Sequence, residues 1–486
     1  MSSFGTMLTC FCFCVMSPTV RAISEISGDG VNFFTSTSPV TMVQNDRSNV
    51  VGIVEMGNSL DSASIQTGDY NRTAIFQLGN ANNLAIVDQL GNFNRALIVQ
   101  VANSENTLQN IDIQQRGGAD AINNLFQFQV SSGDESNPVA YGFSTLTFDQ
   151  AKTVATNFIY GPESSRVNVG LLEDISLHFG TLLKTKLDQD RFKHHDTYSS
   201  VDECKEDSAC STLSTFTFLG YERTTRDNKL GISGYGQNIR SATIGADFFV
   251  EPTKTFGIAL NLEKSASNIE HGLGNVDTVG YQFGAFGSFL RSQYYLDLIA
   301  TLGKVNFETE RFGGAMAAHS DVDGWSYTGL LQTGYSFSSN GFRFSPFLSA
   351  TYSKGTVDAY WETGNTLTTQ WINKQTRKKF AASLGASLDH KDYIGGSPFY
   401  SYLKAEIERD FGIQTKNQII SRFSFSQDTV FTPIDNSHAS TQGKISGGVE
   451  FSFTKKISIA LTGMTLIGPD NEMDKYSIHG GLLINF

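Results

Sequence analysis

Apolar and polar side chains alternate along much of the C-terminal half of the chain. One run places Ile244, Ala246 and Phe248 on one face and Asp247 on the other. A period of two residues is typical of β-strands whose two faces meet different surroundings. About twelve such runs approach the ~9–11 residues that a tilted strand needs to cross a bilayer. The expected strands are residues 214–223, 239–250, 254–266, 276–290, 293–307, 322–338, 341–356, 376–390, 397–411, 441–454, 455–467 and 475–486.

The connections between these strands alternate in length. Residues 252–253, 338–340 and 455–456 are short turns, whereas residues 307–321 and 411–441 are long loops. This alternation is typical of an outer-membrane barrel, while a soluble β-sandwich would have shorter and less regular strands. The pattern therefore favours a closed transmembrane barrel of about twelve antiparallel strands over residues 214–486.

The segment before the barrel has a different period. From about residue 163 to 193, apolar residues recur at steps of three and four, which predicts one amphipathic helix. These residues are Val167, Leu171, Leu172, Ile175, Phe179, Leu182, Leu183 and Leu187. The pattern alone leaves open whether the helix lies in the barrel or packs on a soluble domain.

A repeat of eleven and then twelve residues occupies the N-terminal part of the chain. Its three clearest copies each read Gln-x-Gly-x-x-Asn and precede a short apolar strand. The positions are Gln66, Gly68 and Asn71, then Gln77, Gly79 and Asn82, then Gln89, Gly91 and Asn94, with Gln100 opening a degraded fourth copy. Stacked copies would bury a thin Val/Ile/Ala core, turn at Gly and Asn, and form ladders of side-chain amides. The alternatives are a generic Gln/Asn-rich solenoid or a disordered polar tract.

Two resemblances follow from these motifs. The repeat resembles the curlin repeat of curli amyloid subunits, with Gln66, Gly68, Asn71, Ala74 and Gln77 matching in order. This resemblance covers about seventy residues and implies an adhesive or amyloid-forming module.

The barrel region resembles the translocator domain of bacterial autotransporters. The similar stretches are residues 244–247, 256–259, 334–337, 344–347 and 360–364, in the usual order. The resemblance implies that the helix threads the barrel pore. The last strand, with Tyr476, Ile478, Leu482, Ile484 and the final Phe486, resembles the terminal strand that the barrel-assembly machinery reads.

Composition limits the possible functions. The net charge of −12 and the lack of basic runs argue against nucleic-acid binding. With a mean hydropathy of −0.19, no stretch approaches the ~18 apolar residues of a spanning helix. Residues 1–22 resemble a secretory signal with a cleavage site after Ala22, although the usual basic start is missing. A buried N-terminal strand is the alternative.

Catalytic and metal-binding patterns do not occur. The chain has no Gly-x-Ser-x-Gly, His-Glu-x-x-His or P-loop motif, so we expect no enzyme and no cofactor. His194 and His195 do not have zinc-site spacing. Once residues 1–22 are removed only Cys204 and Cys210 remain, and in an exported protein this close pair is a disulfide candidate.

The sequence therefore predicts an all-β protein with four parts. These are a signal peptide (1–22), a short β-solenoid of curlin-like repeats (23–130), a linker with a pore helix (131–213) and a twelve-stranded barrel (214–486). We expect an autotransporter in a Gram-negative outer membrane that displays the repeats at the cell surface; a pore or structural barrel without a secreted passenger is the alternative. The expected partners are outer-membrane lipid, the inner-membrane export and barrel-assembly machinery, and further copies through the repeats.

Overall fold

The protein divides into two compact units, Met1–Ile159 and Tyr160–Phe486. A computed structural model describes residues 22–25, 32–36, 40–44, 51–57, 60–67, 71–79, 83–90, 94–102, 109–116, 124–131, 146–197, 213–227, 233–251, 253–311, 317–364, 367, 369–412, 418–425, 429–433, 440–454, 456–467 and 473–486. The expected signal up to residue 21, and Gly68, Asn82, Gly91, Cys204 and Cys210, lie outside the described residues.

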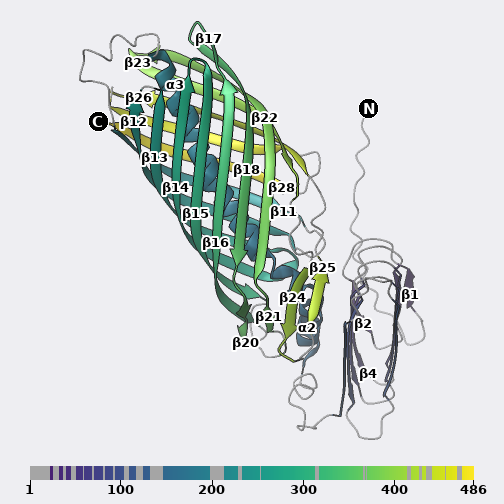
Figure 1. Cartoon of the computed structure of the whole chain (residues 1–486). Helices are drawn as coiled ribbons and strands as arrows, with labels where there is room; N and C mark the ends of the chain where they lie inside the picture. The colour runs from purple at the N-terminus through teal and green to yellow at the C-terminus, as the bar shows by residue number, and fades with distance from the viewer. Residues whose placement is uncertain are drawn as a thin grey trace, which may run out of the picture. The chain divides into compact units, whose positions relative to one another are not determined.

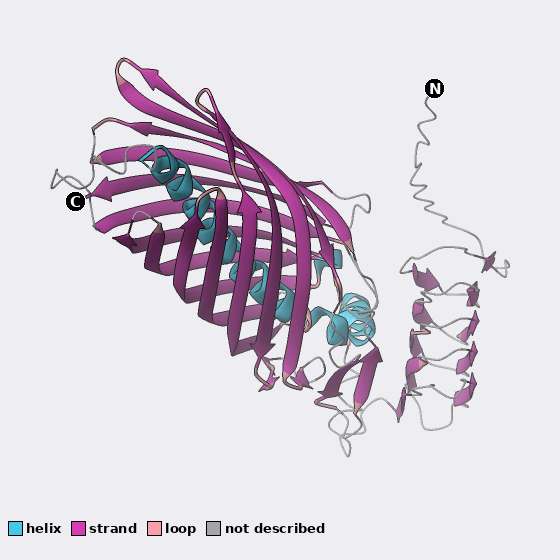
Figure 2. Ribbon diagram, turned by 45° about the horizontal axis from the view of Figure 1, so that its top comes forward, coloured by secondary structure: helices cyan, strands magenta, loops and turns pink. Residues whose placement is uncertain are grey.

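The first unit contains two parallel sheets of short strands (Figure 2). The odd-numbered strands form one sheet in the order β1-β3-β5-β7-β9, and the even-numbered strands form the other in the order β10-β8-β6-β4-β2. The strands are β1 (Ala22–Glu25), β2 (Asn32–Ser36), β3 (Val40–Gln44), β4 (Val51–Gly57), β5 (Asp61–Thr67), β6 (Thr73–Gly79), β7 (Asn83–Leu90), β8 (Arg95–Ala102), β9 (Gln109–Arg116) and β10 (Asn124–Ser131). One full turn of this stack is therefore two sequence repeats.

The two sheets enclose a thin core of aliphatic residues. Ile53, Ile75 and Ile98 come from successive strands of one sheet and are fully buried, facing Ala85 and Val87 of the other. These strands run for seven or eight residues, because they continue through the Gln of the next repeat. Gly79 is the last residue of β6.

The repeated amides form two ladders, one on each side of the core. Gln89 Nε2 donates to Gln66 Oε1 at 2.7 Å, and Gln100 Nε2 donates to Gln77 Oε1 at 2.8 Å. The Asn94 side-chain amide likewise donates to that of Asn71. Residues two repeats apart are paired because consecutive strands belong to different sheets, so the four glutamines form two ladders of two.

A helix that the sequence analysis did not predict follows the repeats. Helix α2 (Phe148–Ser164) begins with a reciprocal capping box between Thr147 and Gln150. Its buried stripe of Ala151, Val154, Ala155 and Phe158 has helical spacing. The Phe158 ring meets Phe126 of β10 edge-on at 5.6 Å, and its carbonyl accepts a hydrogen bond of 2.9 Å from Arg95 of β8. The first half of α2 is thus part of the repeat unit.

The second unit is a closed antiparallel barrel of twelve strands, as the alternation predicts (Figure 1). Strand β28 pairs with both β27 and β11, which closes the sheet. The barrel strands are β11 (Leu213–Arg226), β12 (Tyr235–Glu251), β13 (Lys254–Ile269), β14 (Gly274–Arg291), β15 (Tyr294–Arg311), β16 (Ala318–Tyr335), β18 (Phe342–Val357), β22 (Gln375–Ile394), β23 (Ser397–Asp410), β26 (Thr441–Ser452), β27 (Ile457–Ile467) and β28 (Met473–Asn485). Among the residues described, no helix is long and apolar enough to span a bilayer.

The outer face of the barrel is an apolar band, and aromatic and cationic side chains border it at the end of the barrel with the long loops. Leu260 and Leu262 of β13 point outward, while Asn261 and Glu263, which alternate with them, are buried inside. At the end with long loops, Lys304 lies 5.8 Å from the Trp325 ring and Lys354 lies 5.5 Å from the Tyr327 ring. Such aromatic rows mark the membrane interface, and lysines beside them hold their charge in water.

Several strands extend beyond their predicted bounds at this end. β15 continues to Arg311 and β16 begins at Ala318, although their outward residues there include Glu308, Glu310 and Asp321. These polar residues interrupt the alternation of apolar and polar side chains, but the backbone ladder continues above the bilayer. The alternating pattern therefore predicts the part of each strand that lies in lipid, whereas the strand itself is longer.

We predict that Gln77→Leu destabilises the repeat unit. The Gln77 amide donates to Glu55, Ser62 and the carbonyls of Leu60 and Leu84 at 2.8–3.1 Å, and all of these groups would lose a buried donor. The expected loss is about 3 kcal/mol, because each unmatched buried polar group costs ~1–3 kcal/mol. Pulse proteolysis of the full chain over a urea series measures it. Gln127→Leu, at an exposed position of β10, is the control, and coincident midpoints for the two variants would contradict the prediction.

Candidate functional site

The lumen of the barrel holds one long helix, α3 (Val167–Thr197), which follows α2 after a turn at Ser165 and Arg166. Figures 1 and 2 show α3 running along the inside of the barrel. Its first turns lie with Tyr235, Leu273 and Tyr360 at the end with long loops. Because outer-membrane barrels have short periplasmic turns and longer extracellular loops, the helix begins at the outer mouth and ends on the periplasmic side.

Apolar contacts hold the helix at two levels. Near the outer mouth Leu171, Leu172 and Ile175 pack with Phe307 and Ile372, and further down Phe179, Leu183 and Leu187 pack with Phe216, Phe286 and Leu330. Glycines of the wall make room for these side chains. A Cβ placed on Gly284 of β14 would lie 2.6 Å from Leu183 Cδ1, so a larger residue there would displace the helix. The apolar stripe predicted from the sequence is thus the contact with the barrel wall.

Ion pairs between α3 and the strands form a second set of contacts. In the lower half, Lys186 Nζ lies 2.6 Å from Asp247 Oδ2, Lys184 Nζ lies 3.0 Å from Glu406, and Asp188 lies 2.7 Å from Lys404. Arg191 bridges Asp188 of the helix and Asp297 of β15, and its guanidinium also covers the Tyr295 ring. All of these side chains are largely buried, so their charges depend on one another for compensation.

The upper half of the helix is tied in the same way. Asp174 accepts from Tyr235 Oη at 2.7 Å and from Arg226 at 2.8 Å. His178 lies 2.9 Å from Glu222 and 3.0 Å from Ser241. Glu173 pairs with Arg377. Contacts thus run along the helix from the outer mouth to the periplasmic end.

The two longest loops fold over the outer mouth. Strands β19 (Tyr360–Trp361) and β21 (Gln370–Ile372) of one loop join β24 (Gln418–Phe423) and β25 (Val430–Pro433) of the other in a four-stranded sheet. A buried ion pair between Arg311 and Glu362 ties this sheet to the barrel wall. At the start of α3, Gln375 donates to the Ser165 carbonyl at 3.2 Å. Burial, reinforced by the neighbouring Arg377, lowers the pKa of Arg166 to about 10. The first turn of the helix is therefore enclosed.

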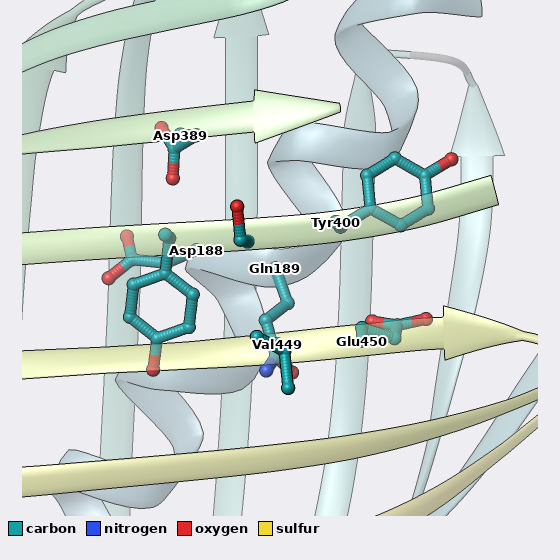
Figure 3. A pocket seen from close by; sticks show the side chains of 8 residues that line it. Asp188, Gln189, Asp389, Tyr400, Val449 and Glu450 are labelled. Carbon is teal, nitrogen blue, oxygen red and sulfur yellow. The ribbon is translucent and has the colours of Figure 1, made fainter. Parts of the chain in front are cut away.

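Towards the periplasmic end the helix does not fill the lumen. A small cavity of about 20 Å³ lies between α3 and the strands β22, β23 and β26. Figure 3 shows Gln189 pointing from the helix towards Val449 and Glu450 of β26, with Asp389 and Tyr400 on the neighbouring strands. Most of the helix packs against β14, β15, β16 and β18, while ion pairs link it to β22 and β23. The helix thus leaves a small gap beside Gln189, next to the contact of Asp188 with Lys404.

The structure distributes the predicted site residues over both units. Tyr476, Ile478 and Leu482 of β28 face outward and about half of each is exposed, Ile484 is half-buried, and the exposed Phe486 donates its backbone N–H to the Leu213 carbonyl. The charged anchors of α3 were not singled out from the sequence. A sequence feature that could have indicated them is the charged residue at a lumen-facing position of a strand with an apolar outer face, as at Asp247, Asp297 and Lys404. Within the described ranges no cluster of residues suited to a metal ion occurs.

A closed twelve-stranded barrel with one helix anchored in its lumen defines a class of outer-membrane translocators. The family model of the autotransporter β-domain matches residues 215–463, more than half of the 486 residues. The chain belongs to this family, and its barrel is an outer-membrane translocator of a Gram-negative bacterium.

Comparison with known proteins gives distant similarities. The chain is 24% identical over 212 residues to esterase EstA of Pseudomonas aeruginosa, covering 40% of this chain and 31% of the esterase. It is also 24% identical over 181 residues to outer membrane protein B of Rickettsia prowazekii, covering 35% of this chain and 11% of that protein. The chain thus matches less than a third of the length of either relative.

Among solved structures, the translocator domain of NalP from Neisseria meningitidis is similar with a TM-score of 0.47 and 14% identity, over 63% of this chain and 98% of that domain. The β-domain of the Bordetella autotransporter BrkA is similar with a TM-score of 0.44 and 14% identity, over 57% of this chain and all of that domain.

We predict that Arg191→Met loosens the helix in the barrel. The substitution leaves Asp297 and Asp188 without their buried guanidinium partner, and breaking such a pair costs about 3–5 kcal/mol. The full-length variant should open more often than the parent in planar-bilayer recordings. Lys304→Met removes an ion pair with Asp323 that is exposed on the outer face and serves as the control. Equal opening frequencies in the two variants would contradict the anchoring role.

Proposed function

We propose that the barrel exports the repeat unit and holds it at the cell surface as a non-catalytic adhesive module. The observation that carries this proposal is the direction of α3. The helix begins at the outer mouth and ends at the periplasmic end, so the chain that precedes it leaves the barrel towards the outside. The repeats precede this helix, and their export would use the inner-membrane and barrel-assembly machinery expected from the sequence.

The architecture of the repeat unit supports a role in self-association. Both sheets are parallel, and in each the glutamine ladder joins neighbouring strands that are two repeats apart in the sequence. Strand β9 ends one sheet and β10 ends the other, and each pairs with a single neighbour among the described strands. An edge strand of this kind is a template for pairing with another chain. The amide ladders resemble those of stacked amyloid units, in which identical side chains lie above one another. A second copy of the repeat unit is therefore the partner that we propose.

An enzymatic passenger has less support. The match covers only 31% of the esterase, so the similarity does not support an esterase activity for this chain. The chain contains no nucleophile motif. A simple pore has less support as well, because the ion-paired helix occupies the lumen.

We predict that the repeats are accessible on intact cells. An epitope tag inserted between Ala102 and Gln109 should bind antibody without permeabilisation, because this connection belongs to the exported unit. The same tag inserted at the short turn Gly395–Gly396, between β22 and β23, should bind only after permeabilisation. Flow cytometry of the two strains measures both. Staining of the repeat tag only after permeabilisation would contradict surface display.

The same cells test the adhesive part of the proposal. Cells with the parent sequence should clump, and Gln77→Leu cells with equal surface staining should clump less, because the stacked ladder is interrupted. Equal clumping at equal staining would exclude self-association through the ladders and leave display intact.

A further inference from the structure

A row of two tryptophans and an arginine crosses the outer face of the loop sheet at the barrel mouth. Trp361 of β19 lies directly opposite Trp371 of β21, which in turn lies opposite Arg422 of β24. The Arg422 guanidinium lies 5.1 Å from the Trp361 ring and 6.0 Å from the Trp371 ring. Neighbouring strands are about 4.8 Å apart, so the row is roughly 10 Å long, comparable with two sugar rings.

The base of this row is rigid. The opposite face of the sheet carries Tyr360, Ile372, Ile419, Phe423 and Val430, all buried. The Glu362 N–H donates to the Gln370 carbonyl and the Gln370 N–H donates to the Glu362 carboxylate, both at 2.9 Å, and Glu362 is the partner of Arg311 on the barrel wall. The Trp361 side chain nevertheless stays 49% exposed. The buried face of this sheet contributes to the core, and its other face presents a half-exposed indole that is suited to binding a ligand.

The charge of Arg422 is available to a ligand. In the described part of the chain Arg422 forms no ion pair, although this end of the barrel carries Asp321 and Asp323 on β16 and Asp358 directly after β18. Stacking on indole rings uses the faces of a guanidinium and leaves its N–H edge directed outward. That edge matches the oxygens of a phosphate or carboxylate, and the indole rings match the apolar face of a sugar.

The height of the row in the membrane narrows the choice of ligand. The outward side chains of β16 change from Trp325 and Tyr327 to Asp323, Asp321 and His319, which marks the upper limit of the lipid. Strand β20 (Thr363–Gly364), two residues after Trp361, pairs with Ala318 and His319. At ~3.3 Å per residue and a tilt of about 40°, this level is roughly 15–20 Å above Trp325. In a Gram-negative outer membrane, this layer contains the phosphorylated saccharide of the outer-leaflet lipopolysaccharide.

We propose that Trp361, Trp371 and Arg422 form a binding site for the phosphorylated core saccharide of the surrounding lipopolysaccharide. The indole rings stack on the sugars and Arg422 pairs with a phosphate. Because the loop sheet also covers the start of α3, occupation of this site would fix the outer mouth to the membrane in which the barrel lies.

Tryptophan fluorescence provides a direct test. The chain has three tryptophans, so Trp325→Phe in the full-length protein leaves only Trp361 and Trp371 as reporters. We expect lipid-free phosphorylated core oligosaccharide to change their emission saturably. Arg422→Gln should weaken this binding about tenfold, the equivalent of one charge-assisted hydrogen bond, and should not change binding of the dephosphorylated oligosaccharide. Trp361→Leu should weaken binding of both.

Matched controls separate binding from folding. Lys354→Gln removes a cation of the same kind from the Tyr327 ring on the barrel wall and should leave binding unchanged. All variants should keep the heat-modifiable band of a folded barrel. The proposal is overturned if Arg422→Gln and Lys354→Gln bind alike, if no saccharide changes the emission, or if a sulfated glycosaminoglycan binds more tightly than the phosphorylated core. The last outcome would assign the row to a ligand outside the bacterium's own membrane.

Discussion

Every backbone N–H and C=O of the spanning segments needs a partner, because lipid offers none. The seam between β11 and β28 completes this pairing, with thirteen residue pairs from Ser214–Asn485 to Arg226–Met473. At its periplasmic end, Phe486 donates to the Leu213 carbonyl at 3.1 Å. Without this seam both strands would present an unpaired edge to hydrocarbon. Closure also fixes the diameter of the barrel, since diameter grows with strand number.

A barrel of twelve strands encloses more space than its own inward side chains can fill. The helix α3 occupies most of that space and brings its own charges into the lumen, where their side chains are largely buried. Lys186, Arg191 and Asp188 each meet an opposite charge on the wall, so the helix fits in one register and one rotation. A small cavity remains beside Gln189, between these contacts. Charges on several strands of the wall thus hold the helix in the lumen.

The parts of the fold that the sequence predicted are those controlled by local surroundings. The alternation around Ile244 and Asp247 predicted β12 because lipid on one side and the lumen on the other impose opposite chemistries. The helical stripe from Val167 to Leu187 predicted α3 for the same reason. The sequence did not predict which residues distant in the chain would pair with one another. The repeat period of eleven to twelve residues did not show that Gln66 pairs with Gln89 and not with Gln77, because that depends on the division of the strands between two sheets. The partners of Arg191 depend on the depth and rotation of the helix, which no local pattern encodes. The loop row of Trp361, Trp371 and Arg422 unites residues from two loops that lack alternation.

The helix α3 threads the barrel in one register, which its contacts with the wall define. A cysteine pair in the intact outer membrane tests it most directly. Ser176 Oγ of the helix lies 2.7 Å from Thr328 Oγ1 of β16 in the lumen, so Ser176→Cys with Thr328→Cys should form a disulfide under mild oxidation. Ser176→Cys with Ala405→Cys, whose second position is exposed on the outer face of β23, should not. Cross-linking of the first pair and not the second, seen as a shifted band on non-reducing gels, is the predicted result. Free thiols in both pairs, with the barrel folded, would contradict the threaded helix.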